Sequence, residues 1–372
     1  MTEARGIVVG LFLAACLVIA SASEALCQTA PARKDLRDII GVTHVAGKYH
    51  LTDKDFLNEG ADQILALGSR VIKLYLLRPA HDYPFNTQWP ETRSLVEVAQ
   101  TAPYVAVFKK PFTTYIMTTY SVGRSDHYWR TGMSEADKAD ETRQFRELAR
   151  HFLTTYRGTG KTFIFQHWEG DWAIRGKTDP KLDPTPQAIE GMIAWLNARQ
   201  EGVNQARAEV GEHGVHVYHA AEVNLVVQSM RGGRPGVTNR VLPKTNVDLV
   251  SYSAWDGQGD PKTLRDALDF IAKNTPPSKV FGAKNVYLGE FGKPENDSTP
   301  AQVEQTIRTA VETGLDWGCP YIVYWQVYCN EARTTPVKGN ADVRGFWLIR
   351  PDGTRTVAWD YFSRLLAGPG NR

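Results

Sequence analysis

The order of strands and helices along the chain predicts a single (β/α)8 TIM barrel with long rim loops. From residue 39 onward, short apolar segments rich in β-branched and aromatic residues alternate with helical segments, and eight such strands follow one another. This alternation is typical of a parallel sheet with right-handed crossovers. The chain has 372 residues, which accommodates a barrel of roughly 250 residues or more.

The alternative is an open, doubly wound α/β sheet. Such a sheet usually carries a glycine-rich phosphate loop after an early strand. The sequence contains neither a GxGxxG nor a GxxxxGK[ST] motif, and this favours the barrel.

Each element is placed by its own pattern of apolar residues. The predicted strands are residues 39–47, 70–77, 114–122, 161–169, 215–223, 247–255, 285–292 and 320–328. The predicted helices are residues 53–68, 93–101, 134–156, 185–210, 261–274, 299–318 and 356–367. Asp53 and Ser134 are suited to begin helices, and Gly68 to end one. The stretch 224–246 contains QSMRGGRPGVTNR and is predicted to be a loop.

The N-terminus has the order of a secretory signal peptide. Arg5 precedes the apolar run 7–20, and the small-residue stretch SASEA follows at 21–25. We expect a signal peptide over residues 1–28, cleaved between residues 22 and 30, a catalytic barrel over 36–369, and a secreted or periplasmic protein. A lipoprotein with Cys16 in its lipobox and an uncleaved anchor are the alternatives. The run is shorter than the about 20 residues that a spanning helix needs.

Charge and composition narrow the class of partner. Lys and Arg number 43 and Asp and Glu 41, a net charge of +2. This near balance gives no reason to expect nucleic acid, and it suits an uncharged partner such as a glycan. The oligomeric state is not encoded in any feature we recognise.

Two glutamates stand at the ends of apolar strands. Glu169 ends the fourth predicted strand, and Glu290 lies in the seventh. In a barrel both would face the C-terminal rim, where active sites of this fold lie. A carboxylate there is costly to bury without a purpose or a partner. Retaining glycosidases use two carboxyls about 5–5.5 Å apart, one as acid/base and one as nucleophile.

The residues around Glu290 carry a family resemblance. The segment Val286-Tyr287-Leu288-Gly289-Glu290-Phe291-Gly292 resembles the strand-seven motif of clan A glycoside hydrolases, which include family 5 endoglucanases and mannanases. Trp325 is similar to a tryptophan that floors the substrate subsite in that clan, and the stretch 67–74 resembles its second strand. The resemblance implies a retaining O-glycosyl hydrolase acting on a poly- or oligosaccharide without cofactor or metal, with Glu290 as nucleophile and Glu169 as general acid/base.

Two departures point to a divergent branch of this clan. Trp168 stands where the clan usually has Asn, and Lys73 stands where it usually has Arg. The tryptophans at strand ends suit stacking on sugar rings. The residues expected to bind substrate are His44, Lys73, His167, Trp168, Trp172, Glu222, Asn224, Tyr252, Trp255 and Trp325.

The sequence is also compatible with two other functions. The polar residues at strand ends could form a metal site of a sugar isomerase or metallohydrolase; these are His167, Glu169, Asp171, His219, Glu222 and Glu290. A barrel that binds carbohydrate without turning it over is the second alternative.

Overall fold

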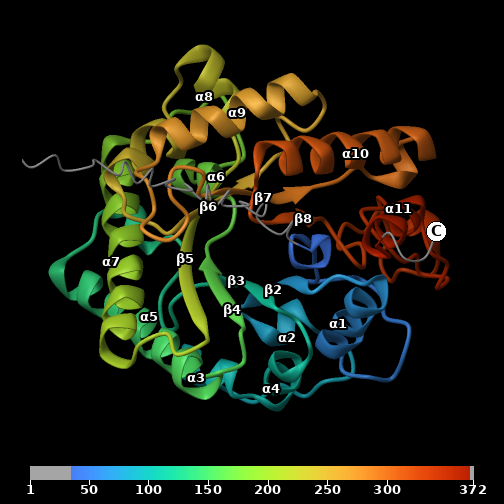
Figure 1. The fold of residues 1–372 in the computed structure, drawn as a ribbon, viewed down its shortest axis with the longest axis horizontal. Helices are drawn as coiled ribbons and strands as arrows, with labels where there is room; N and C mark the ends of the chain where they lie inside the picture. Colours follow the sequence, from blue (N-terminus) through green and yellow to red (C-terminus); the bar gives the residue numbers. More distant parts are fainter. Residues whose placement is uncertain (1–34, 369–372) are drawn as a thin grey trace, which may run out of the picture. The chain divides into compact units, whose positions relative to one another are not determined.

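Residues 35–368 are described by a computed structural model, in which eight parallel strands close into a barrel. Each strand pairs with the next along the chain, and β8 returns to pair with β1. Figure 1 shows the strands enclosed by helices. The predicted (β/α)8 barrel is therefore confirmed, and the open sheet is excluded. The signal peptide predicted for residues 1–28 lies outside the described residues.

All eight predicted strands are present, and every one is shorter than predicted. They are β1 Ile40–Thr43, β2 Val71–Leu76, β3 Thr114–Thr119, β4 Thr162–Gln166, β5 His216–Val223, β6 Leu249–Ser253, β7 Val286–Phe291 and β8 Ile322–Tyr324. At several strand ends the missing residues leave the sheet and line a cavity instead, as Val45, Glu169 and Trp325 do. An apolar pattern does not distinguish a residue paired in the sheet from one packed at its rim.

The seven predicted helices are confirmed as well. The helices are α1 Phe56–Leu67, α2 Pro79–Asp82, α3 Leu95–Ala99, α4 Ala102–Lys109, α5 Glu135–Thr155, α6 Gly170–Arg175, α7 Pro186–Val210, α8 Val226–Gly232, α9 Pro261–Asn274, α10 Pro300–Trp317 and α11 Val357–Leu366. Four of them, α2, α4, α6 and α8, were not predicted. The prediction that 224–246 is a loop is wrong, because α8 forms before Gly233 ends it in the left-handed conformation.

The residues that begin and end the helices agree with the sequence prediction at two of three positions. Ser134 forms a capping box with Asp137, and Gly68 ends α1 with φ at 102°. The N-cap of α1 is Asp55 rather than Asp53, because the Asp55 side chain accepts the backbone N–H of Asn58. Asp53 and Asp55 are both suited to cap a helix by residue type, and the backbone conformation before α1 determines which of them does so.

The interior of the barrel changes from apolar to polar along the strands. Side chains alternate between the two faces of a strand, so Val71, Lys73 and Tyr75 of β2 share a face. Lys73 contacts β5 and β7 across the barrel, which identifies this face as the interior. Val71 belongs to a buried apolar cluster near the start of the strands; its other members are Ile116, Ile164, Tyr218, Ala220, Leu249, Tyr287, Tyr321 and Val323. The polar positions therefore lie toward the C-terminal ends, where a barrel carries its active site.

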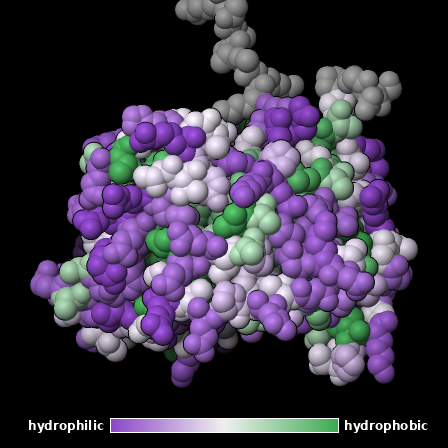
Figure 2. Space-filling model, turned by 90° about the horizontal axis from the view of Figure 1, so that it is seen from below, coloured by the Kyte–Doolittle hydropathy of each residue, from purple (hydrophilic) through white to green (hydrophobic). Residues whose placement is uncertain are grey.

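The face in Figure 2 is mostly hydrophilic, with small and scattered apolar groups. Within residues 35–368 we find no helix with the length and apolar character needed to cross a membrane.

Candidate active site

A buried ammonium lies at the centre of the site. Lys73 Nζ of β2 donates to Glu290 Oε1 at 2.8 Å, to the carbonyl of Gly289 at 3.2 Å and to Glu222 Oε2 at 3.4 Å. The side chain has no solvent exposure. Burial lowers the pKa of Lys73, but the carboxylates of Glu290 and Glu222 outweigh burial and hold this pKa above its usual value. Lys73 therefore stays charged and joins β2 to β5 and β7.

Glu290 is turned toward Lys73 by an irregularity in β7. The register with β6 shifts so that Ser253 pairs with Glu290, and this bulge redirects the following side chains. Gly289 is required here, because a Cβ atom at this position would meet Ser251 Oγ at 1.8 Å. Glu290 Oε2 then accepts the Ser253 hydroxyl at 3.0 Å and the Trp255 indole N–H at 3.3 Å. With Lys73 on the other oxygen, three donors hold the Glu290 carboxylate in place.

Glu169 occupies a different environment. It follows β4, precedes α6 and adopts the left-handed conformation with φ at 48°, which is uncommon outside glycine. Its backbone N–H donates to Glu222 Oε1 at 2.7 Å, while its own carboxyl has no hydrogen-bond partner among the described residues. Burial, followed by the charges of Glu290 and Glu222, raises the pKa of Glu169 to about 8. This carboxyl is therefore protonated at neutral pH.

Glu222 connects the two glutamates. Besides Glu169 and Lys73, this fully buried carboxylate accepts from Gln166 Nε2 at 2.8 Å and Ser251 Oγ at 3.0 Å. Burial raises its pKa to about 7, against the lowering effect of Lys73. All its oxygens are engaged by the protein, so its position indicates support of Glu169 rather than contact with substrate.

His167 and Gly170 complete this support. His167 Nε2 accepts the backbone N–H of Glu222 at 2.9 Å, and its ring packs against Trp195. A Cβ atom on Gly170 would meet the Glu222 carbonyl oxygen at 2.2 Å, so only glycine lets α6 start this close to β5. These contacts hold the backbone on both sides of Glu169.

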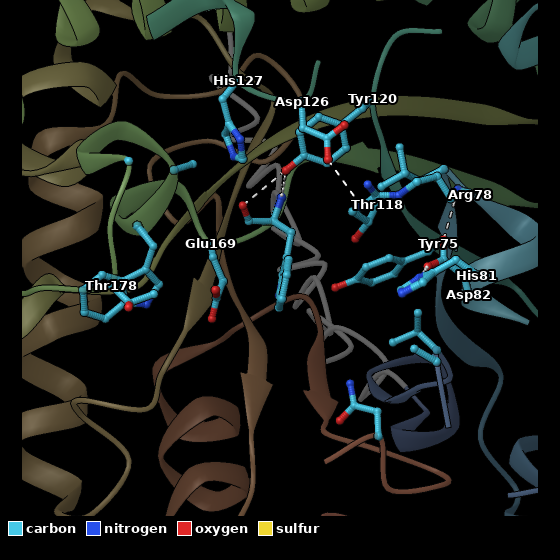
Figure 3. A pocket seen from close by; sticks show the side chains of 18 of the residues that line it. Tyr75, Arg78, His81, Asp82, Thr118, Tyr120, Asp126, His127, Glu169 and Thr178 are labelled. Atoms are coloured by element: carbon cyan, nitrogen blue, oxygen red, sulfur yellow. Dashed lines mark hydrogen bonds and ion pairs between the residues drawn. The ribbon is translucent and has the colours of Figure 1, made fainter. Parts of the chain in front are cut away.

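A cavity of about 520 Å³ opens beside Glu169 (Figure 3). Trp168, Trp172 and Trp325 line it; Trp168 is 37% exposed, whereas Trp325 is 5% exposed. In Figure 3 the Glu169 side chain lies between Thr178 on one side and Tyr75, Arg78 and Asp82 on the other. Glu290 is 2% exposed and is not among the residues that line the cavity. The cavity size and its aromatic walls suit a small number of sugar rings.

Seven of the ten residues expected to bind substrate do not line the cavity. Four of them contact the glutamates instead, namely Lys73, His167, Glu222 and Trp255. The other three are His44, Asn224 and Tyr252. His44 is fully buried, its Nε2 lies 2.7 Å from the Phe56 carbonyl, and it packs among aromatic rings. Asn224 Oδ1 accepts the backbone N–H of Asp171. Tyr252 is buried and donates to Asp256 Oδ1 at 2.6 Å. None of the three lines the cavity, and these contacts favour structural roles, because a strand-end position alone does not say which way a side chain points.

Several residues of the site had no sequence signal that we recognised. Ser251 and Ser253 hold the glutamates, and Tyr75 and Thr118 line the cavity as direct partners on β2 and β3. Tyr75 follows Lys73 by two residues, so the alternation of the strand identifies its face. Arg130 and Lys177 also line the cavity, but they come from loops whose paths no local pattern predicts.

The residues of the possible metal site are not arranged as a set of metal ligands. Within residues 35–368, no three His, Cys, Asp or Glu side chains are grouped to hold a metal ion. His219 of β5 packs against Phe145 of α5, on the outer face of the strand. The arrangement instead resembles paired carboxyls with distinct environments.

Comparison with known proteins supports the same class of fold. No protein-family model and no curated protein matches the sequence. The solved GH5_18 structure from Bifidobacterium longum subsp. longum ATCC 55813 matches with a TM-score of 0.56 and 14% identity, covering 90% of this chain and 80% of that one. An exo-β-1,4-mannosidase from Opitutaceae bacterium strain TAV5 matches with a TM-score of 0.56 and 14% identity, covering 88% of this chain and 59% of that one.

A family 39 glycoside hydrolase from Bacteroides cellulosilyticus WH2 matches with a TM-score of 0.56 and 11% identity, covering 90% of this chain and 64% of that one. At these identities the matches establish a common fold. The chain thus has the barrel fold of glycoside hydrolases of families 5 and 39, and the fold resemblance to clan A is confirmed.

The role of Lys73 can be tested through stability. At pH 8 we expect Lys73→Met to lower the free energy of unfolding by about 3–5 kcal/mol, because Glu222 and Glu290 remain buried without their cation. The loss should be smaller at pH 5. Burial raises the folded-state pKa of Glu222, and Lys73→Met removes the charge that opposes this, so stability falls as pH rises through the folded value. Urea unfolding at both pH values measures this difference.

Lys73→Arg is the matched control, since it keeps the positive charge, and it should retain most of the stability at both pH values. An equal loss for Lys73→Met at pH 5 and pH 8 would show that the side chain acts by packing alone.

Proposed function

We propose that this chain is a retaining glycoside hydrolase that cleaves a poly- or oligosaccharide by double displacement, with Glu290 as nucleophile and Glu169 as general acid/base. The observation that carries the proposal is the contrast between the two carboxyls. Glu169 is half-buried, its carboxyl has no hydrogen-bond partner within residues 35–368, and its pKa is raised to about 8, whereas Glu290 is held by Lys73, Ser253 and Trp255. A retaining mechanism needs one carboxyl protonated and the other ionised at the same pH.

In the first step Glu290 attacks the anomeric carbon. The bond between this carbon and the leaving oxygen breaks, and that oxygen takes the proton from Glu169. The products of the step are a glycosyl ester on Glu290 and the released alcohol. Trp168 and Trp172 provide apolar walls that keep the proton on Glu169 before reaction.

In the second step Glu169 acts as a base. Once Glu290 is esterified, its negative charge no longer raises the pKa of Glu169. The ionised Glu169 then removes a proton from water, the water oxygen attacks the anomeric carbon, and Glu290 leaves as a carboxylate. The sugar is released with its original anomeric configuration.

The substrate is a carbohydrate, as for the neighbours of the same fold. A variant of the Bifidobacterium GH5_18 enzyme was solved in complex with Manβ1-4GlcNAc. We further propose that residues 1–28 export the chain, so that it degrades glycans in the periplasm or outside the cell.

Substitution of the two glutamates separates their roles. We expect Glu290→Gln to lower turnover by more than about 10³-fold, because no covalent intermediate forms. Glu169→Gln should lower turnover of natural glycans by about 10²–10⁴-fold, and mostly spare aryl glycosides whose leaving groups need no proton. Initial rates with both substrate types measure the difference. Full activity in Glu290→Gln would exclude this mechanism, and glycan binding without turnover in the wild type would indicate a binding protein.

The pH profile follows from the same two groups. Because the first step needs protonated Glu169, kcat/KM should fall as pH rises through about 8. In Glu169→Gln, assayed with an activated aryl glycoside, this fall should disappear. A profile of kcat/KM between pH 5 and 10 checks both; a basic limb that persists in Glu169→Gln would assign it to another group.

Export is checked by N-terminal sequencing of the protein from cells that express the full chain. We expect the mature chain to begin between residues 23 and 31. Recovery of an intact N-terminus would mean that the segment is not removed.

A further inference from the structure

Some of the charged side chains that line the cavity form ion pairs, and others do not. Three cations, Arg78, Arg130 and Lys177, line it. Arg78 lies 3.4 Å from Asp126. Arg130 and Lys177 form no ion pair within residues 35–368, and the Arg130 guanidinium makes no hydrogen bond there to another residue. We call Arg130 and Lys177 the basic wall.

The carboxyls of the same lining do not neutralise the basic wall. Asp126 is paired with Arg78. Asp82 lies 2.9 Å from His81 Nδ1 and accepts the backbone N–H of Arg78. Burial raises the pKa of Glu169, and its carboxyl forms no ion pair within residues 35–368. Arg130 and Lys177 are therefore left without a paired carboxylate in this lining.

The basic wall has a defined place relative to the reacting groups. A Cβ atom on Gly176 would meet Arg130 Nη1 at 2.0 Å, so the missing side chain leaves room for the guanidinium against the end of α6. Glu169 stands at the other end of this six-residue helix, which is about 9 Å long. Trp172 lies on α6 between them and also lines the cavity. In Figure 3, Thr178, next to Lys177, is on the opposite side of Glu169 from Arg78 and Asp82.

We infer that the basic wall binds an anionic group of the glycan, either a carboxylate of a uronic acid or a sulfate ester. The guanidinium of Arg130 offers several parallel donors, which match the oxygens of such groups, and the Lys177 ammonium adds a second charge. Since the wall lies at the far end of α6 from Glu169, the anionic group belongs to a part of the glycan displaced from the bond that breaks. This inference rests on the proposed function and specifies its substrate class.

The local charge differs from the expectation drawn from the whole chain. A net charge of +2 suited an uncharged partner. That balance, however, averages over ion pairs across the surface, and a substrate meets only the groups that line the cavity.

The test uses pairs of polymers that differ only in charge. One pair is a glucuronoxylan and the same polymer after reduction of its carboxyls to alcohols; the other is a sulfated galactan before and after desulfation. For the full chain, kcat/KM and the dissociation constant by calorimetry are measured for each member. We expect the anionic member of one pair to be preferred by at least about tenfold, and high salt to reduce this preference because it screens exposed charges.

Substitution of Arg130 and Lys177 then tests whether the basic wall causes the preference for anionic polymers. In the double variant Arg130→Gln, Lys177→Gln the ratio between anionic and neutral members should fall by about tenfold. Arg143→Gln is the control, because this exposed arginine of α5 pairs with Asp140 and Glu147 and does not line the cavity. Its ratio should equal that of the wild type.

The outcomes separate this inference from the proposed function. If neutral members are hydrolysed as fast as anionic ones, or if the ratio of anionic to neutral kcat/KM is unchanged in the double variant, the inference that the basic wall binds an anionic group is wrong. The proposed glycosidase function would not be affected. Absence of hydrolysis on every glycan that binds contradicts the proposed function. In that case the calorimetric preference still decides whether the basic wall binds anions.

Discussion

The buried ion cluster of Lys73, Glu222 and Glu290 is the interaction on which both the barrel interior and the site depend. Two carboxylates in a region without solvent would repel each other and lose their hydration, and a single ammonium between them offsets both costs. The cluster spans β2, β5 and β7, so it joins strands far apart in sequence. Through the bond from the Glu169 backbone to Glu222, it also fixes the fourth strand end. Packing and chemistry are therefore supported by the same contacts.

The difference between the two carboxyls proposed to react, those of Glu169 and Glu290, follows from this cluster. Glu290 receives three donors, whereas the Glu169 carboxyl receives none from the described part of the chain and lines the cavity together with tryptophans. Burial and the negative charges of its neighbours then raise the pKa of Glu169. In the proposed mechanism one of these charges disappears when Glu290 is esterified, so the same geometry would provide an acid in the first step and a base in the second.

Much of this could be predicted from the sequence, because the barrel repeats one local pattern. The alternation of strands and helices identified all eight strands, and the glutamates at two strand ends identified the residues proposed to react. The failures have physical causes. His44 and Asn224 lie at strand ends but turn into the protein, which depends on contacts distant in sequence. The bulge at Gly289 depends on Ser251 of another strand, and Arg130 comes from a loop. Alternation along β2 identifies the face of Tyr75, but no local pattern shows that it borders a cavity.

The central claim, that Glu290 becomes covalently bound to the sugar, is most directly tested by trapping the intermediate. The full chain is incubated with a panel of 2-deoxy-2-fluoroglycosides carrying activated leaving groups, which slow the second step more than they slow release of the leaving group. Intact mass and peptide mapping then locate the added sugar. We expect one fluoroglycosyl group per chain, attached to the peptide that contains Glu290. Attachment to another carboxyl, or a product with inverted configuration from a turned-over substrate, would contradict it.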